Sequence, residues 1–328
     1  MSLAETIKRE ARTLGFDAVG ITTVDPFSYT TLLDRLHEWL ARGYHGTMAW
    51  LARDPSRRAD PRLVLPGCRS MLSLGMSYDT GHRATEGQGY GRVARYAWGK
   101  DYHVIMGERL ERLEASIKAL APGAVTRAYV DTGPVMEKAW AQQAGLGWIG
   151  KHSNLVSADH GSWLVLGEIL TTLDLTPDEP ATDLCGSCSL CINACPTGAI
   201  VEPYVVDARR CVSYLTIEYR GPGDSIPEDL KSRMGNHIFG CDDCLDVCPF
   251  NLRAGTDADA AFLPSRGLLA PQLNDLTGLT ETQFAERFRG SPIRRAKLVG
   301  LRRNVAIAQD NEARVQNRAL SPLPSLAK

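Results

Sequence analysis

Several stretches of the chain carry apolar residues at intervals of three and four positions, the spacing that predicts an amphipathic helix. The first stretch is marked by Leu3, Ile7, Ala11 and Leu14. The same spacing predicts helices over residues 29–41, 101–120 and 135–144, the last with Pro134 in its first turn. Residues 257–318 are also expected to be mostly helical.

Short continuous apolar runs lie between these helices and predict buried strands. They cover residues 18–22, 70–78 and 125–130, and we expect residues 154–156 and 162–172 to form a final hairpin. Residues 80–91 are rich in glycine and predict a loop, and the tail at 321–325 is expected to be loose. Mixed helices and strands of this kind predict an α+β domain over residues 1–175.

Eight of the nine cysteines follow that domain, between residues 185 and 248. The first run, Cys185-Gly-Ser-Cys-Ser-Leu-Cys-Ile-Asn-Ala-Cys195-Pro, matches the bacterial ferredoxin spacing C-x2-C-x2-C-x3-C-P. The second run is shorter and reads Cys241-Asp-Asp-Cys-Leu-Asp-Val-Cys248-Pro. Cysteines two or three residues apart on a tight turn can face one cubane, so the spacing predicts two [4Fe–4S] clusters.

The ferredoxin spacing also predicts which cysteines share a cluster, because the fourth cysteine of a run ligates the other cluster. One cluster is assigned to Cys185, Cys188, Cys191 and Cys248. The second is assigned to Cys195, Cys211, Cys241 and Cys244, with Cys211 replacing the cysteine that the shorter run lacks. Two zinc sites would use similar pairs but do not need the x3-C-P ending, and disulfides need an oxidising compartment.

Composition narrows the class of protein further. The chain has 328 residues, 44% of them hydrophobic, and a formal net charge of −1, which suggests about two domains with an ample core. The N-terminus has no signal-peptide pattern and no apolar run reaches 18 residues, so we expect a cytoplasmic protein with no membrane contact. Residues 281–318 contain nine Lys or Arg against four Asp or Glu, which predicts a basic surface near the C-terminus.

Three local signals do not lead to a function. Gly145-Leu-Gly-Trp-Ile-Gly150 fits the dinucleotide fingerprint by letter, but it follows a predicted helix instead of a strand. Asp101-Tyr-His103 resembles a corrinoid-binding signature with one residue too many, and Asp101 is interpreted as a helix N-cap. Cys68 is isolated in the sequence and is interpreted as a small buried hydrophobe.

Together these motifs resemble the epoxyqueuosine reductases, cobalamin-dependent iron–sulfur enzymes of queuosine synthesis in tRNA. Besides the cysteine runs, the resemblance is carried by residues 60–62, 95–103, 129–134, 145–154, 211–218 and 294–304. It implies a cobalamin-binding α/β domain over residues 1–175, a ferredoxin-like domain over 176–252, and a short helical, basic, tRNA-contacting segment over 253–328. Many relatives carry a longer C-terminal helical extension, and the shorter segment here is expected to affect how much of the grip on tRNA is retained.

The resemblance also implies a reaction and its partners. The substrate is tRNA with epoxyqueuosine at the wobble position, and the enzyme, a monomer, removes the epoxide oxygen reductively. An external donor of the flavodoxin or ferredoxin type passes electrons through the clusters to base-off cobalamin. Two alternatives stay open: another corrinoid iron–sulfur reductase, related to reductive dehalogenases, and a two-cluster electron-transfer protein.

Asp131 is the candidate general acid. It ends a predicted strand, where its side chain can project into a cleft, and burial would raise its pKa toward neutrality. An aspartate before Thr-Gly-Pro is also a good helix N-cap, so the residues alone leave both roles open. The resemblance of Tyr129-Val-Asp-Thr-Gly-Pro134 to the family favours the acid.

Polar residues elsewhere are candidates for cofactor or RNA contacts. The candidates for holding cobalamin, with Asp131, are Arg58, Tyr96, Lys151, His152, Asn154, Ser213 and Thr216. Ordinary alternatives are a surface loop for His152, a packed helix face for Ser213 and Thr216, and a solvated side chain for Arg58. The candidates for tRNA phosphates are Arg294, Arg295, Lys297, Arg302 and Arg303.

Overall fold

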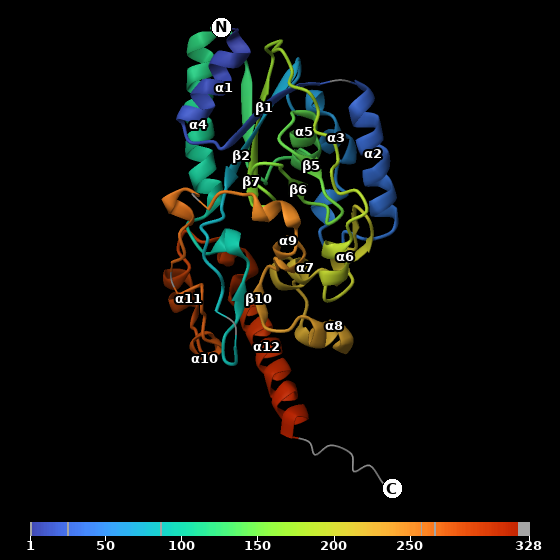
Figure 1. Cartoon of the computed structure of the whole chain (residues 1–328), viewed down its shortest axis with the longest axis vertical. Coiled ribbons are helices and arrows are strands. Elements are labelled where there is room, and N and C mark those ends of the chain that lie inside the picture. Colours follow the sequence, from blue (N-terminus) through green and yellow to red (C-terminus); the bar gives the residue numbers. More distant parts are fainter. Residues whose placement is uncertain (1, 25, 86, 257, 266, 321–328) are drawn as a thin grey trace.

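The computed structural model describes residues 2–320 except 25, 86, 257 and 266, and Figure 1 shows its arrangement. The tail at 321–325, expected to be loose, lies outside the described residues. The molecule is elongated, with the N-terminus at one end and the last helix leading away from the other. Among the described helices, none combines the length and apolar character that a bilayer crossing requires.

An antiparallel sheet of four strands organises the N-terminal half. Its strands are β1 (Ala18–Thr23), β2 (Ser70–Ser77), β7 (Leu164–Thr171) and β4 (Thr126–Tyr129), in that spatial order. Since β2 and β7 occupy the centre and are buried along nearly their whole length, they read as continuous apolar runs, as the sequence predicted. Ser73 pairs with Glu168 in this register, so both side chains point to the same face.

Helices cover both faces of the sheet (Figure 1). They are α1 (Leu3–Thr13) and α4 (Tyr102–Leu120) on one face, and α2 (Pro26–Ala41), α3 (Pro55–Ala59) and α5 (Glu137–Gln143) on the other. Leu72, Leu74 and Met76 of β2 pack under α1 and α4, while Met71 packs with Trp140 of α5. Trp140 has no exposed surface, and full burial of a large apolar side chain contributes about 1.5–3 kcal/mol.

Two sequence predictions in this half need correction. The hairpin expected from residues 154–156 and 162–172 does not form, because β6 (Leu155–Val156) pairs with β5 (Trp148–Ile149) and β7 pairs with β2 and β4. The helix expected over 135–144 starts only at Glu137. Both errors arise because strand pairing and the loop before α5 depend on residues distant in sequence.

The second half of the chain is built from short elements around the cysteine runs. They are α6 (Leu190–Ala194), β8 (Ile200–Glu202), β9 (Val205–Val206), α7 (Val212–Ile217), α8 (Glu228–Arg233), β10 (His237–Phe239) and α9 (Asp243–Asp246). The last helices are α10 (Leu273–Thr277), α11 (Glu281–Arg287) and α12 (Lys297–Leu320). Between Thr277 and α12, Thr280 starts α11 with a capping box.

The hydrophobic cores do not follow the expected segment boundaries. β3 (Arg92–Val93) pairs in parallel with β10, and one core cluster joins Val93 and Trp98 to Phe239, Phe288 and Leu301. Residues 92–98 therefore tie the N-terminal half to the C-terminal helices. The division at 175 and 252 stays a prediction about domains.

Candidate active site

Asp131 occupies a strained position just beyond β4. Its φ is 54°, in the left-handed region that a residue other than glycine adopts only where its surroundings impose it. Its backbone N–H donates to Glu137 Oε1 over 2.6 Å, and the N-cap of α5 is Met136. A Cβ at Gly133 would lie 2.5 Å from the Tyr129 ring, so this turn requires glycine. Asp131 is therefore not a helix cap, and its exposed carboxylate projects from a constrained loop.

His103 connects Asp131 to a second carboxylate. Its Nε2 lies 3.4 Å from Asp131 Oδ2 and its Nδ1 lies 2.7 Å from Asp101 Oδ1. Asp101 is the N-cap of α4, as expected, and its carboxylate also accepts the His103 N–H over 3.0 Å. Asp101, His103 and Asp131 form a triad in which the imidazole bridges two carboxylates.

The two carboxylates of this triad favour the protonated form of the His103 imidazole. Burial lowers the pKa of His103, but the hydrogen bonds to Asp101 and Asp131 outweigh it and raise that pKa to about 9. In return, the hydrogen bond from His103 lowers the pKa of Asp131 against the effect of burial. Burial does act to raise the pKa of Asp131, as expected, but the hydrogen bond from His103 outweighs it and the net pKa is lowered. The proton that could serve an acid therefore resides on His103 at neutral pH.

Lys138 is a cation close to Asp131. Its side chain is exposed to solvent, yet the protein around it lowers its pKa by burial. Its Nζ donates to Asn154 Oδ1 over 2.7 Å and to Ser153 O over 3.0 Å. The charge of Lys138 interacts with Glu137 and Asp131, and also with the Cys244 and Cys211 thiols. We call the region formed by Asp131, His103, Lys138 and Asn154 the Asp131 cleft.

Two tyrosines complete the wall next to Asp131. The pKa of Tyr102 is raised by burial and then by the Asp131 charge, and its ring stacks on His103 with centroids 4.1 Å apart. The ring of Tyr96 meets Tyr102 edge-on at 6.0 Å, and its pKa is raised by burial, Asp242 and Asp131. The cleft therefore combines ionisable groups with apolar ring surfaces, the lining typical of a ligand site.

The clustered cysteines interact with one another, and their division into two sets of ligands stays a prediction. Burial raises the pKa of Cys244 well above its usual range, followed by the charges of Cys211 and Cys195, and Cys241 interacts with Cys244 and Cys211 in the same way. We call Cys195, Cys211, Cys241 and Cys244 the inner group, because two of its members, Cys211 and Cys244, interact with Lys138.

The other cysteines form an outer group. Burial raises the pKa of Cys191, and the charges of Cys185 and Cys188 add to this effect. The Cys185 sulfur accepts a hydrogen bond from Trp148 over 3.4 Å. Cys248 lies at the end of α9, which packs on α6, and it lines a cavity of about 360 Å³. All nine cysteines are described and none is in a disulfide, so the donor set fits two thiolate-held cubanes.

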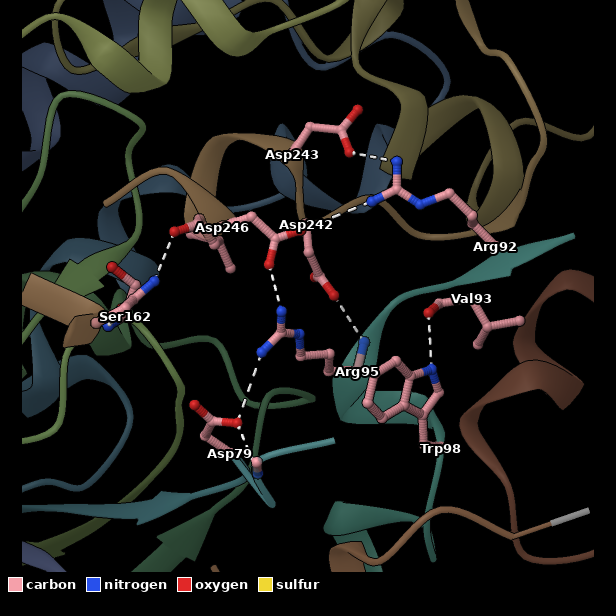
Figure 2. A network of polar contacts seen from close by, with 12 residues as sticks. Asp79, Arg92, Val93, Arg95, Trp98, Ser162, Asp242, Asp243 and Asp246 are labelled. Carbon is pink, nitrogen blue, oxygen red and sulfur yellow. Dashed lines mark hydrogen bonds and ion pairs between the residues drawn. The ribbon is translucent and has the colours of Figure 1, made fainter. Parts of the chain in front are cut away.

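A buried ionic network holds the inner group against the N-terminal half (Figure 2). The Arg95 backbone donates to Asp242 over 2.7 Å, and its guanidinium contacts Asp246 at 2.5 Å and Asp79 at 3.5 Å. The same guanidinium lies 4.3 Å from the centroid of the Trp163 ring. Because Asp242 and Asp246 flank Cys244, Arg95 fixes α9 relative to the sheet.

Only some predicted cofactor residues lie at the Asp131 cleft. Tyr96 and Asn154 do so through the contacts above, and Ser213 interacts with the Cys211 thiol. Arg58 faces the Glu137 charge, and its guanidinium donates to the Trp50 carbonyl over 3.4 Å. These four side chains come from separate elements that the fold brings together.

The remaining predicted cofactor residues have structural contacts instead. Thr216 has no exposed surface, and its hydroxyl donates to Val212 O and accepts from the Gly240 N–H. Burial lowers the pKa of His152 to about 4, and its Nδ1 accepts the Asn154 N–H over 3.1 Å. Lys151 donates to the carbonyls of Gly186 and Cys188 over 2.5 and 2.8 Å, which stabilises the outer-group loop.

The predicted tRNA residues also divide into two kinds. Arg294 and Lys297 are exposed, and Arg295 is exposed while it pairs with Glu218 through two contacts of 2.8 Å. Arg302 donates to the Leu279 carbonyl over 2.5 Å. Arg303 is half-buried and donates to the carbonyls of Leu215, Tyr219 and Gly221 over 2.6–3.0 Å. The prediction that Arg303 serves RNA is therefore corrected: its donors are used inside the protein.

Sequence reasoning missed several side chains of the site. His103 belongs to the Asp101-Tyr-His103 motif, which is interpreted from the sequence as an ordinary helix start. Its role as a bridge depends on Asp131, which is distant in sequence. Lys138 and Glu137 lie in the first turn of α5 and carried no motif. Glu168 lies inside an otherwise apolar strand, and that unusual position was the one signal that could have indicated it.

Two family models match parts of the chain. Residues 58–132 match the family described as epoxyqueuosine reductase QueG, DUF1730, and residues 184–251 match a 4Fe-4S double cluster binding domain. The first range contains Asp101, His103 and Asp131, and the second contains all eight clustered cysteines.

Known proteins with these features are similar over most of the chain. An epoxyqueuosine reductase of Gloeobacter violaceus is 47% identical over 309 residues, covering 93% of this chain and 95% of that protein. The Escherichia coli enzyme of the same name is 42% identical over 313 residues, covering 94% and 81%.

Solved structures agree with these matches. An epoxyqueuosine reductase with an epoxyqueuosine-modified tRNA stem loop has a TM-score of 0.87 and 32% identity, covering 94% of this chain and 81% of that one. A Bacillus subtilis epoxyqueuosine reductase, whose aspartate-bearing catalytic loop is swung out of the active site, has a TM-score of 0.86 and 31% identity, covering 94% and 82%.

Proposed function

The chain belongs to the epoxyqueuosine reductase family, and we infer from this that it reduces epoxyqueuosine to queuosine in tRNA. The single observation that carries the chemistry is that Lys138 interacts both with the carboxylates of Glu137 and Asp131 and with the Cys244 and Cys211 thiols of the inner group. An electron source and a proton source thus meet in the same space. A protein that only transfers electrons needs no such cleft of ionisable groups, so the reductase interpretation is the stronger one.

The reaction has a fixed balance of atoms and electrons. The two carbon–oxygen bonds of the epoxide break and a carbon–carbon double bond forms. The oxygen leaves as water, which requires two electrons and two protons. The two [4Fe–4S] clusters carry the electrons from a reduced donor protein, one at a time.

The position of the cysteine groups supports an order of electron transfer. The outer group, Cys185, Cys188, Cys191 and Cys248, holds the cluster that receives electrons from the donor. The inner group, Cys195, Cys211, Cys241 and Cys244, holds the cluster beside the cleft, because Cys244 and Cys211 interact with Lys138. The donor itself is of the flavodoxin or ferredoxin type.

Asp131 delivers a proton to the departing oxygen. Because the pKa of His103 is raised to about 9 by its two carboxylate partners, the Asp131–His103 pair carries a proton at neutral pH. Asp131 is the exposed member, so it touches the substrate, and His103 replaces the proton that Asp131 gives up. Asp101 keeps the imidazole oriented through its 2.7 Å contact.

Cobalamin in its base-off form fits the lining of the cleft. When bound, it supplies a cobalt centre that changes oxidation state in single steps. The Asn154 amide, the Ser213 hydroxyl and the Arg58 guanidinium are suited to hold the amide groups of a corrin ring, and the Tyr96 ring contributes apolar surface. The chain's own part is to orient the ring, exclude water and deliver protons.

Exposed cations near the cleft are suited to the tRNA. Arg295 lies with its guanidinium 5.3 Å from the centroid of the Trp50 ring, and its charge also interacts with Asp131. Arg294 and Lys297 are neighbouring exposed cations. A single-stranded anticodon loop can present its modified base to the cleft while these cations contact phosphates.

Anaerobic turnover tests this function directly. Protein with both clusters is incubated with cobalamin, a reductant and tRNA that contains epoxyqueuosine, and the nucleosides are then analysed. We expect queuosine to replace epoxyqueuosine only when cobalamin and reductant are both present. Unchanged epoxyqueuosine in the complete mixture, from protein with full cluster content, would contradict the proposal.

A further inference from the structure

Glu168 is an ionisable group in the interior of the central sheet. It lies in β7 opposite Ser73 and has no exposed surface. Neither of its carboxyl oxygens has a hydrogen-bond partner among the residues that the structure describes. An ionised carboxylate in such a place would be strongly unfavourable, so the carboxyl holds its proton.

Among the described residues, no cation contributes to lowering the pKa of Glu168, and Arg127 of β4, opposite Leu170, donates to the Val64 carbonyl instead. The side chains around it on this face of the sheet include the apolar or aromatic Met71, Leu170 and Trp140, with Ser73 of β2 and Tyr129 of β4 directly opposite. Burial raises the pKa of Glu168 well above its usual range. The charges of two neighbouring acids, Glu137 and then Asp131, raise it further. A neutral Glu168 is therefore expected throughout the neutral range.

Glu137 connects this buried acid to the Asp131 cleft. It begins α5 and is half-buried, and its Oε1 accepts the backbone N–H of Asp131 over 2.6 Å. Burial and then the charge of Asp131 raise the pKa of Glu137 to about 7, against the opposite effect of Lys138. Arg58 faces the same carboxyl. The carboxyl of Glu137 thus interacts with that of Glu168 and also contacts Asp131.

The number of protons that the reaction consumes suggests a role for Glu137 and Glu168. Removal of an epoxide oxygen as water takes up two protons, and the Asp131–His103 pair holds one. We propose that Glu168 and Glu137 form a carboxyl pair that stores a proton under α5 and supplies it to the Asp131 cleft. This inference rests on the proposed function. Glu137 releases the second proton into the cleft and Glu168 replaces it, while the electrons come from the donor through the clusters.

Infrared spectroscopy tests whether the store exists, independently of turnover. Protein with both clusters is measured at a pH above neutrality, where Glu137 is ionised, for the carbonyl stretch of a protonated carboxylic acid. We expect a band in the unchanged protein that disappears in Glu168→Gln, a substitution that keeps the size of the side chain and the neutral charge. Glu111→Gln, at an exposed position on α4, is the matched control and should keep the band. A band that persists in Glu168→Gln overturns the proposal.

The pH profile of turnover tests whether the stored proton is used. Above neutral pH Glu137 is ionised and Glu168 alone holds the proton, so Glu168→Gln should lose at least about tenfold in rate there and change little below neutrality. Glu137→Gln should slow turnover across the whole range. A purely structural role would lower the rate equally at every pH.

The two experiments separate failure of this inference from failure of the proposed function. Loss of the infrared band in Glu168→Gln together with a pH profile parallel to that of the unchanged protein would overturn the supply of protons. Absence of queuosine formation by the unchanged protein would instead refute the proposed function, and the infrared band would still decide whether Glu168 holds a proton.

Discussion

The imidazole Nε2 of His103 lies 3.4 Å from the carboxylate Oδ2 of Asp131, which joins the first turn of α4 to the loop that follows β4. The contact is partly open to solvent, and the left-handed backbone of Asp131 directs the carboxylate toward α4. Strain of this kind costs of order 1–3 kcal/mol and persists where the surrounding structure imposes it. The Asp131–His103 contact is therefore a constrained feature of the cleft.

Replacement of Asp131 by asparagine should abolish most turnover. The substitution keeps the shape of the side chain but removes its ability to pass a proton, and loss of a general acid costs about 10²–10⁴ in rate. The measurement is the rate of queuosine formation, with iron content and bound cobalamin determined on the same sample. Both should be unchanged, and a variant with full activity would refute the acid role of Asp131.

Replacement of Asp101 by asparagine should lower the pKa of His103 from about 9 toward its usual value, because one of its two carboxylate partners is lost. NMR titration of the imidazole measures this change. In the folded protein the pKa of His103 lies above the unfolded value of about 6.5. Its contribution to stability is therefore complete below pH 6.5 and is lost as the pH rises through 9.

The Asp101→Asn variant should accordingly show a smaller fall in stability over that pH window than the unchanged protein. Thermal denaturation at a series of pH values checks this. Glu111→Asn, at an exposed position of the same helix, serves as the control. Identical pH dependence in Asp101→Asn and the unchanged protein would mean that His103 does not take its charge from Asp101.

Replacement of Cys211 by serine should remove the inner cluster and leave the outer one. The unchanged protein should bind about eight iron atoms and the variant about four, since each cubane has four irons. Iron analysis and electron paramagnetic resonance make the measurement. Cys68→Ser is the matched control, because Cys68 is buried in the N-terminal half, and it should keep both clusters. A full iron content in Cys211→Ser would show that Cys211 is not a ligand.

Replacement of Arg303 by alanine should destabilise the fold without a direct effect on RNA contacts. The change leaves the carbonyls of Leu215, Tyr219 and Gly221 without their donor, and each unpaired buried group costs about 1–3 kcal/mol. Denaturant unfolding measures the loss. Arg294→Ala, at an exposed position, should be nearly neutral in the same assay. Equal stability of the two variants would contradict the structural role of Arg303.

Replacement of Arg294 and Arg295 by alanine together should weaken binding of the tRNA. If both contact phosphates, the slope of log affinity against log salt should fall by about two, since each phosphate contact contributes nearly one. Titration of an anticodon stem loop at several salt concentrations measures the slope. The Arg302→Ala variant is the comparison. Because Arg302 donates to the Leu279 carbonyl, its loss should change the salt slope less than the double substitution does. An unchanged slope in the double variant would place the RNA elsewhere.

The cysteine spacing by itself indicated a domain with two [4Fe–4S] clusters, and the apolar periodicity predicted most of the helices and strands around the N-terminal sheet. These signals are local, because a turn that presents three thiols and a helix with an apolar face each need only a few consecutive residues. The sequence also indicated Asp131, although it left the choice between an acid and a helix cap open. The start of α5 at Glu137 decided that choice.

Only the tertiary structure decided which groups meet. Asp101 and His103 lie about thirty residues from Asp131, and Glu168 is further away, yet the fold brings them to one end of the same sheet. In the fold the Arg303 guanidinium donates to backbone carbonyls while Arg294 is exposed, although both belong to one basic stretch. The reason is physical: the pKa and the availability of a charged side chain depend on burial and on distant partners, and neither is written in the local sequence.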